Sequence, residues 1–413
     1  MNKHTEVIII GAGLAGLTAA KVLKEAGKSI LVLEACNEVG GRIKTDNLNG
    51  FQLDRGFQVF LTAYPETKRF LNYDELDLCY FDPGALILTA NGKMTIGDPL
   101  RKPSSLFQTL FSSAGTLMDK LRILKLKLRL QQKTVEAIFL EKETTTLNYL
   151  ITAGFSEKFI NQFFKPFFTG IFLEEKLATS SRMFEFVFKM FSEGEAAIPA
   201  KGMGLIPLQL SRDLLPTEIL FNHKVIAIEG NAVTTASGNH YSADFVLFAT
   251  DAPGLPIPSN NEKRNYRSVT NMYFTSPEKI FDKPLIGLNA LPAKLVNTIA
   301  VMDKISPSYS KSGASLISLS LIGNHQHEDQ KILQNKVIKE LSFWYPSATK
   351  WQHLKTYHIE YALPNDDQVS GEPDVALLNP TWFICGDHLT NGSINAAMKS
   401  GRVAAEAILR KKI

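Results

Sequence analysis

The chain begins with an alternation of apolar runs and glycines that is typical of a strand, a helix and a second strand. Residues 7–10 (VIII) form a continuous apolar run, as expected for a strand buried on both faces of a parallel sheet. Residues 11–16 (GAGLAG) follow, and apolar positions then recur at helical spacing as far as Gly27. Another apolar run at residues 30–33 predicts the next strand. This stretch therefore predicts one βαβ unit.

The glycine-rich turn of this unit has the spacing of a dinucleotide-binding loop. Gly11 permits the tight turn, Gly13 lets backbone N–H groups approach a pyrophosphate, and Gly16 lets the helix pack closely on the strand. Leu14 and Ala15 begin the helix, whose N-terminal N–H groups and dipole favour an anion. A glycine-rich turn without a ligand is the alternative, but the combined pattern favours a nucleotide.

An acidic residue stands where the second strand ends. Glu34 follows Gly16 by 18 residues, and its carboxylate can accept hydrogen bonds from a ribose diol. Ala35 comes next. NAD and FAD both satisfy this pattern.

Two long inserts separate further apolar strands. Residues 271–274 and 315–322 predict strands in the second insert, whereas the first insert is mainly helical after a hairpin around Asn91 and Gly92. We find no internal repeat and no low-complexity linker.

Near the end of the chain, a short apolar strand at residues 382–385 precedes a helix within 391–409. Small residues such as Gly392 and Ser393 suit a helix end that approaches a ligand or a strand closely. A simple C-terminal docking helix is the alternative interpretation.

Residues 155–191 contain 11 of the 26 phenylalanines. Phenylalanines at helical spacing usually pack in a core, and this interpretation is slightly favoured. The alternative is an apolar substrate cavity or its entrance.

Residues 101–133 carry eight basic side chains and one acidic side chain, Asp119, although the whole chain has a net charge of only +4. On a helix, Arg122, Lys125 and Arg129 would share one stripe flanked by leucines, which suits an anionic membrane surface. A solvated helix face remains slightly favoured, and the alternation in LKLKLRL also allows a strand.

Composition and cysteine spacing exclude several classes of protein. The balanced net charge argues against a nucleic-acid partner. Cys36, Cys79 and Cys385 are far apart, without the spacing of a disulfide framework or a metal site. We expect no metal, no signal peptide and no membrane span, and therefore a cytoplasmic protein, with peripheral attachment to the inner face of a membrane left open.

Three segments together resemble the flavin amine oxidase superfamily, which includes monoamine and polyamine oxidases, protoporphyrinogen oxidase and phytoene desaturase. The first runs from Glu34 through Gly40, Gly41 and Arg42 to LDRGFQVF at residues 53–60. The second is KGMGLIPLQLSRDLLPTEILFNHKVIAIEG, which begins at residue 201. The third is WFICGDHLTNGSINAAMKSGRVAAE, which begins at residue 382. The resemblance is specific only in these regions.

The resemblance implies a non-covalent FAD, because the covalent cysteine motif of the family is not found. It adds cofactor-binding candidates to those from the βαβ unit: Gly41, Arg42, Asp54, Gly56, Phe57, Gln58, Val225, Gly386, Asp387, Ser393, Ile394 and Ala397.

The implied fold is α/β, a Rossmann-like FAD-binding domain with a discontinuous α+β substrate domain, as in p-hydroxybenzoate hydroxylase and amine oxidases. We expect the FAD-binding domain to comprise residues 1–75, 200–258 and 366–413. The substrate domain would comprise residues 76–199, mainly helical, and 259–365, rich in strands. The substrate should lie between the domains.

A bound flavin implies dehydrogenation of an organic substrate by hydride transfer to flavin N5, with oxygen, a quinone or another acceptor reoxidising it. No catalytic residue can be named, since there is no triad, and His325 and His327 look like a loop pair. The water-holding lysine of several amine oxidases also has no clear match, because Lys304 lies in a loop-like segment. The phenylalanine-rich insert and the absence of a recognisable aromatic-cage motif favour the phytoene-desaturase and protoporphyrinogen-oxidase side of the superfamily. That resemblance implies a large apolar substrate.

Two alternatives stay open. One is an amine oxidase that releases hydrogen peroxide. The other is a non-catalytic escort of lipidated proteins, since Rab GDP-dissociation inhibitors resemble this superfamily in fold.

Overall fold

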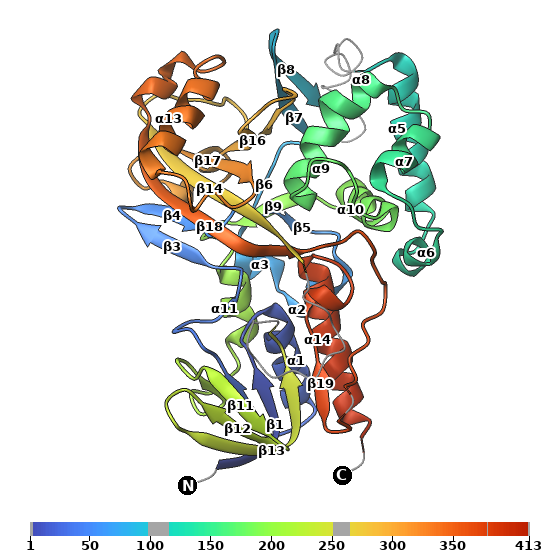
Figure 1. The fold of residues 1–413 in the computed structure, drawn as a ribbon, viewed down its shortest axis with the longest axis vertical. Coiled ribbons are helices and arrows are strands. Elements are labelled where there is room, and N and C mark those ends of the chain that lie inside the picture. The colour runs from blue at the N-terminus through green and yellow to red at the C-terminus, as the bar shows by residue number, and fades with distance from the viewer. Residues whose placement is uncertain (1–2, 98–114, 251–264, 378, 412–413) are drawn as a thin grey trace.

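The computed structural model describes residues 3–97, 115–250, 265–377 and 379–411. The chain forms two lobes, each built around a seven-stranded sheet (Figure 1). The α/β class predicted from the sequence is confirmed.

The first sheet lies in the lobe that holds both termini (Figure 1). Its strand order is β10-β2-β1-β13-β12-β11, and β19 pairs with β13. The bounds are β1 (Lys3–Ile10), β2 (Ile30–Leu33), β10 (Ile219–Leu220), β11 (Val225–Glu229), β12 (Ala232–Thr235), β13 (His240–Phe248) and β19 (Trp382–Ile384). β10, β2, β1, β13 and β19 are parallel neighbours, whereas β12 and β11 extend the sheet in antiparallel pairs. Three distant stretches of chain therefore build one sheet.

Two helices begin at the carboxyl edge of this sheet. α1 (Leu14–Glu25) follows β1 after the glycine-rich turn, and α14 (Ile394–Leu409) follows β19. They pack against each other (Figure 1), although nearly the whole chain separates them in sequence.

The second sheet forms the other lobe, with the order β18-β14-β17-β16-β15-β7-β8. Its strands are β7 (Gly84–Thr89), β8 (Gly92–Gly97), β14 (Tyr266–Ser276), β15 (Ile286–Asn289), β16 (Val296–Val301), β17 (Ser315–Ile322) and β18 (Gln352–Pro364). All neighbours are antiparallel except β15 and β7. The hairpin around Asn91 and Gly92 is confirmed, and it is formed by β7 and β8. The exact domain boundaries stay a prediction.

Helices from the first insert lie beside this sheet (Figure 1). They are α5 (Leu117–Gln131), α6 (Val135–Leu140), α7 (Thr146–Thr152), α8 (Glu157–Phe159), the π-helix η2 (Ile160–Phe164), α9 (Lys165–Phe172) and α10 (Ser181–Glu193). Residues 157–172 are thus one helical rod with a π-bulge. Pro166 explains the bulge, since its ring would clash with a carbonyl one turn earlier and it donates no hydrogen bond.

The other elements are short except for α13. They are β3 (Thr45–Leu48), β4 (Phe51–Asp54), β5 (Phe60–Leu61), β6 (Leu78–Tyr80), β9 (Ala196–Pro199), α2 (Pro65–Phe70), α3 (Tyr73–Leu76), α11 (Leu205–Ser211), α12 (Met302–Ile305), η3 (Pro307–Tyr309), α13 (Gln330–Leu341), η4 (Pro346–Lys350) and η5 (Asp387–Leu389). Within the described residues, no helix is long and apolar enough to cross a membrane.

The basic segment is a helix where the structure describes it, which excludes the alternative strand at LKLKLRL. Thr116 caps α5 and forms a capping box with Asp119. Burial alone would raise the pKa of Asp119, but hydrogen bonds from Ser156 and Thr116 lower it to about 2. Residues 101–114 of this segment lie outside the described residues.

A buried carboxylate joins the two lobes. Asp54 at the end of β4 is 1% exposed and accepts hydrogen bonds from Thr45 Oγ1 (2.6 Å), Met203 N (2.9 Å) and Tyr309 Oη (2.7 Å). Tyr273 of β14 donates to the Asp54 carbonyl oxygen (3.0 Å). Burial raises the pKa of Asp54, and the bound donors oppose that rise.

We expect Tyr309→Phe to lower the free energy of unfolding by about 1–3 kcal/mol, because it removes a donor from a fully buried carboxylate. Tyr80→Phe is the matched control, since the Tyr80 side chain is 45% exposed. Urea unfolding followed by fluorescence measures both. Equal stability of the two variants would show that the Asp54 contacts do not hold the lobes together.

Candidate functional site

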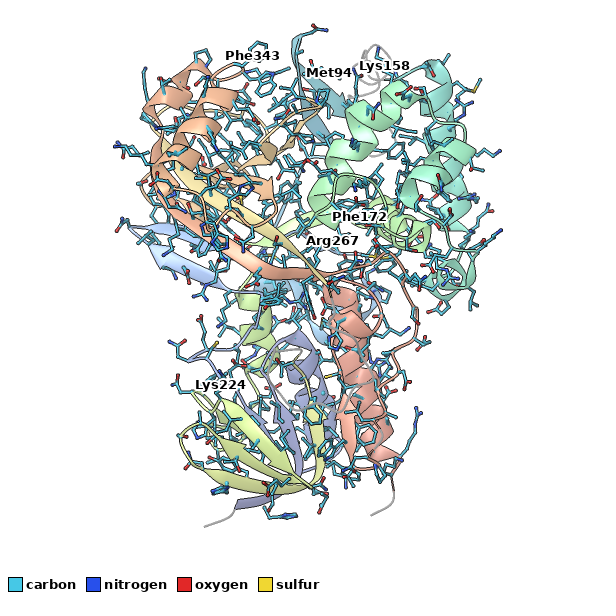
Figure 2. The ribbon with its side chains drawn as sticks, viewed as in Figure 1. Met94, Lys158, Phe172, Lys224, Arg267 and Phe343 are labelled. Carbon is cyan, nitrogen blue, oxygen red and sulfur yellow. The ribbon has the colours of Figure 1, made fainter. Side chains whose placement is uncertain are left out.

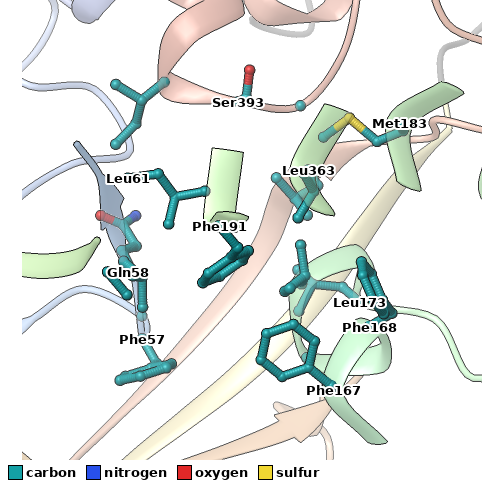
Figure 3. Close-up of a pocket in the computed structure, with 18 of the residues that line it drawn as sticks. Phe57, Gln58, Leu61, Phe167, Phe168, Leu173, Met183, Phe191, Leu363 and Ser393 are labelled. Atoms are coloured by element: carbon teal, nitrogen blue, oxygen red, sulfur yellow. The ribbon is translucent and has the colours of Figure 1, made fainter. Parts of the chain in front are cut away.

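One cavity of about 990 Å³ extends between the lobes. One end is lined by the glycine-rich turn and Glu34, and the other end by phenylalanines of the helical layer. Figure 3 shows Gln58, Leu61 and Ser393 together with Phe167, Phe168 and Phe191 around this space. The volume is at the upper end for sites of cofactors and drug-sized ligands.

The glycine-rich turn leaves open space on its cavity side and none on its core side. Gly13 lines the cavity, and a Cβ placed on it would meet no atom within 4 Å. A Cβ at Gly16 would instead collide with the Gly11 carbonyl oxygen. In the described structure no side chain caps α1, so its N-terminal N–H groups face the cavity without a side-chain acceptor. The turn thus offers donors and room to a phosphate.

Glu34 braces this turn from the end of β2. Its Oε2 accepts from Ala12 N (2.7 Å), its Oε1 accepts from Cys36 N (2.8 Å), and its side chain lines the cavity. A carboxylate has about four acceptor positions, so capacity remains for two hydroxyl donors. This geometry suits the ribose diol predicted from the sequence.

An ion pair joins segments from opposite ends of the chain. Arg42 contacts Asp387 through Nη2 and Oδ1 at 2.5 Å, and it donates through Nη1 to the Ala362 carbonyl oxygen (3.0 Å). Asp387 is buried, and both residues of the pair line the cavity. Gly386 has a φ of 152°, and a Cβ there would strike the His388 imidazole. The turn after β19 therefore requires glycine.

The N-terminus of α14 also faces the cavity. Ser393 caps the helix by accepting from Ala396 N (3.0 Å), and Ser393, Ile394 and Ala397 all line the cavity. Gly401, further along the same face, contacts Ala15, and a Cβ at Gly401 would collide with the Ala15 carbonyl oxygen. Two helix N-termini are in this way brought to one space.

Most predicted cofactor residues line this cavity. They are Gly11, Gly13, Leu14, Ala15, Glu34, Gly41, Arg42, Gly56, Phe57, Gln58, Gly386, Asp387, Ser393, Ile394 and Ala397.

The structure does not bring the other four predicted residues to the cavity wall. Gly16 and Asp54 are buried behind it, in the α1 contact and the interlobe cluster described above. Val225 is buried in the first sheet at the start of β11, and the exposed Ala35 follows Glu34 away from the cavity. Their part in cofactor binding stays a prediction.

The phenylalanine-rich segment contributes both to a core and to the cavity wall. Five of its rings, those of Phe155, Phe164, Phe172, Phe184 and Phe186, lie away from the cavity wall in a helical core. The other six line the cavity: Phe159, Phe163, Phe167, Phe168, Phe188 and Phe191. The first set of rings therefore packs inside the helical layer, and the second set forms the cavity wall on that side, which we call the roof.

Sequence reasoning missed the polar floor beneath this roof. Thr298 of β16 and Ser320 of β17 are paired across the second sheet, and both line the cavity. The alternation SLISLSLI in β17 is the signal, because it places Ser318 and Ser320 on one face of the strand.

Two other cavity features were also missed. Tyr266 and Tyr361 line the cavity with ring centroids 5.5 Å apart and nearly perpendicular planes. Lys120 and Lys127 of α5 line it as well. Lys304 does not line it.

Arg267 ties the roof to the segment before β19. Its Nη1 donates to the Phe172 carbonyl oxygen (2.9 Å) and its Nη2 donates to Asp367 (2.8 Å), and Figure 2 shows Arg267 below Phe172. The neighbouring residue Asp366 accepts a hydrogen bond from Gly392 N through Oδ2 (2.8 Å). Burial raises the pKa of Asp366 to about 7, with Asp387 and Asp367 acting in the same direction and Gly392 N–H and Arg267 opposing them.

Comparison with known proteins assigns the chain to a family. The model of the family described as flavin containing amine oxidoreductase matches residues 14–409. The chain belongs to this amine oxidoreductase family. It is therefore a flavin-dependent oxidoreductase, and FAD is the cofactor that the family implies. The escort alternative is not retained.

Individual relatives agree with this family. L-amino-acid oxidase of Trimeresurus stejnegeri is 24% identical over 99% of this chain and 87% of its own length. The chloroplastic/chromoplastic 15-cis-phytoene desaturase of Narcissus pseudonarcissus is 39% identical over 16% of this chain and 12% of its own. Putrescine oxidase bound to putrescine has the same fold, with a TM-score of 0.70, 16% identity and complete coverage of both chains.

The residues present fit FAD. The open side of Gly13 leaves room for the pyrophosphate, and Glu34 retains acceptor positions. Two buried atoms of cavity residues, Gln58 Oε1 and His388 Nε2, have no hydrogen-bond partner within the described structure. Polar groups of a bound dinucleotide would satisfy such atoms.

We expect Gly13→Ala and Gly16→Ala to separate binding from folding. Gly13→Ala places a methyl group in cofactor space, so FAD affinity should fall by roughly tenfold or more with little change in the apoprotein Tm. Gly16→Ala should lower stability by about 1–3 kcal/mol through overpacking. Isothermal titration with FAD and thermal unfolding of the apoprotein measure the two effects. A stable Gly13→Ala variant with unchanged FAD affinity would contradict the phosphate placement.

Asp366 should make stability depend on pH. Its folded-state pKa of about 7 lies above the ordinary 3.8, so the folded protein binds this proton more tightly than the unfolded chain does. The stability that the carboxyl contributes is therefore complete below pH 3.8 and is lost as the pH rises towards 7. We expect Asp366→Asn, which keeps an acceptor for Gly392 N–H, to remove about 1–4 kcal/mol of this loss. Tm measured from pH 5 to 8 tests it. Parallel curves for the two proteins would show that Asp366 does not titrate there.

Proposed function

We propose that this protein holds FAD without a covalent bond and dehydrogenates an organic, mainly apolar substrate by hydride transfer to flavin N5. A bound flavin supplies the redox chemistry by accepting two electrons and a proton as hydride from a substrate C–H bond. An acceptor such as oxygen or a quinone would be the co-substrate that takes up the electrons. The supporting observation is the single cavity that joins the Gly13 turn to the Phe167 region.

The chain's own residues would bind and orient the reactants and exclude water from them. The α1 N-terminus and Glu34 hold the dinucleotide end, while Arg42 and Asp387 fix the turn before α14. Phe163, Phe167 and Phe191 cover the substrate and exclude water. Thr298 and Ser320 supply hydroxyl groups from the floor, which orient a polar substituent of the substrate.

A non-covalent cofactor agrees with the cysteines near the site. Cys385 lines the cavity, but burial raises the pKa of its thiol far above the ordinary value, so the thiol stays protonated and is a poor nucleophile. Cys36 and Cys79 do not line the cavity. All three cysteines are free, as fits the reducing cytoplasm that we propose as the location.

An amine oxidase that releases hydrogen peroxide is the second candidate. The perpendicular rings of Tyr266 and Tyr361 favour it, because aromatic faces attract an ammonium group. Tyr361 precedes Ala362, whose carbonyl oxygen is bound by Arg42, so this pair lies beside the cofactor end of the cavity. The phenylalanine roof thus favours an apolar substrate, whereas the tyrosine pair favours an amine.

Freshly purified protein should show oxidised-flavin absorption bands, and heat denaturation should release intact FAD that mass spectrometry identifies. Anaerobic mixing with polyenes, porphyrinogens and amines should then bleach the bands with an apolar substrate. Bleaching only by amines, with peroxide formed in air, would select the second candidate. A colourless protein that binds no added FAD would overturn both.

A matched pair of variants tests the roof once a substrate is found. Phe167→Ala removes a ring that lines the cavity, so we expect kcat/KM to fall by about tenfold or more. Phe343→Ala is the control, because its side chain is 62% exposed and does not line the cavity.

A further inference from the structure

Helix α5 carries a ridge of leucines on its outer side. Leu117, Leu121 and Leu128 are 64%, 52% and 52% exposed, and Leu124 lies half-buried between them. Their spacing of four, three and four residues places all four on one helix face. We call this set the α5 ridge.

Exposed apolar side chains are concentrated on this helix. Among the described residues, 13 large hydrophobic side chains are exposed, and four of them, those of the three ridge leucines and Met118, belong to α5. Single exposed leucines are ordinary on soluble proteins, but several on one helix face indicate a contact surface.

The ridge lies at the rim of the cavity, which we call the lip. Leu126 and Leu130 face the protein core on one side of α5, and Lys120 and Lys127 line the cavity on another. The ridge leucines Leu117, Leu121 and Leu124 also line the cavity, so the same apolar surface continues from the solvent side into the interior. Figure 1 places α5 at the outer edge of its lobe.

The charges of α5 are arranged differently from the stripe predicted from the sequence. Arg129 pairs with the buried Glu185 (2.6 Å), and Arg122 lies 3.8 Å from Asp119. Two of the three predicted stripe residues therefore form ion pairs within the protein. Lys125 is exposed. Residues 115–133 still carry six basic side chains against one acidic side chain. Lys133 also pairs with Glu141 (2.8 Å) and Glu185 (3.2 Å), so Lys125 is the exposed lysine of α5. The helix combines an apolar face with an excess of basic over acidic side chains along its own length.

We propose that the α5 ridge docks on an anionic lipid bilayer. Leucines at the level of the headgroups with lysines beside them are the pattern of helices that lie in the membrane interface. Lysine stems can lie along apolar surface while their ammonium groups reach lipid phosphates. A second copy of this chain is a poorer partner, because a symmetric contact would bring two basic helices together.

Docking does not depend on the proposed reaction. It places the lip of the cavity against the lipid, and an apolar substrate would then enter without crossing water; that consequence alone rests on the proposed function.

Co-sedimentation of the full-length protein with vesicles tests the proposal. We expect binding to vesicles with 30% phosphatidylglycerol in phosphatidylcholine and weaker binding to pure phosphatidylcholine. Leu121→Asp with Leu128→Asp should lower the partition coefficient by about tenfold or more. Lys125→Glu should lower it by about fivefold at low salt, and less at high salt.

Variants on α13 serve as matched controls. Ile332 is 54% exposed and Lys339 is exposed, so Ile332→Asp and Lys339→Glu repeat the chemical changes on another helix and should bind vesicles normally. A wild-type protein that stays in the supernatant overturns the proposal, and so do ridge variants that bind like these controls. A vesicle-free dimer that the ridge substitutions dissociate would assign the ridge to a second copy and also overturn it. Circular dichroism checks that each variant is folded.

Discussion

The close contact between the first and last long helices is the constraint on which this structure depends. Gly16 lets α1 lie against the turn that precedes it, and Gly401 lets α14 lie against the Ala15 backbone. Because both contacts are made by bare backbone, both N-termini reach the same end of one cavity. The Arg42–Asp387 pair then fixes the loops beside them. One end of the cavity is therefore built from two ends of the chain, and neither end could form it alone.

The sequence signals for this end of the cavity are local. A β-branched run, a glycine-rich turn and a terminal acid constrain neighbouring backbone, so Gly13 and Glu34 lie where the spacing placed them. Such local signals do not determine which way a side chain turns. Asp54 belongs to the LDRGFQVF segment of the resemblance, and Thr45, Met203 and Tyr309 bind its carboxylate away from the cavity.

The second lobe was less predictable because tertiary contacts decide its details. Helical spacing cannot tell which phenylalanines pack and which line a cavity, since both need apolar rings. The π-bulge at Ile160–Phe164 shifts the register of the rod just where Phe163 meets the cavity. Likewise, LKLKLRL alternates like a strand, and the Thr116–Asp119 capping box is the local feature that favours a helix. Arg267 binds groups from Phe172 to Asp367, a connection that no local pattern contains.

The two lobes also differ in what their shared cavity asks of a ligand. At the end with the glycine-rich turn, backbone N–H groups and carboxylates are held in place by hydrogen bonds, so this end is polar and geometrically strict. At the roof, rings such as Phe163 and Phe167 stack with centroids 5.8 Å apart and offer area without direction. A rigid polar end joined to an apolar end without fixed directions can hold ligands that share a polar part and differ in their apolar part. Thr298 and Ser320 are then the features that can discriminate among them, because hydroxyl groups left without partners on the floor would penalise a wholly apolar ligand.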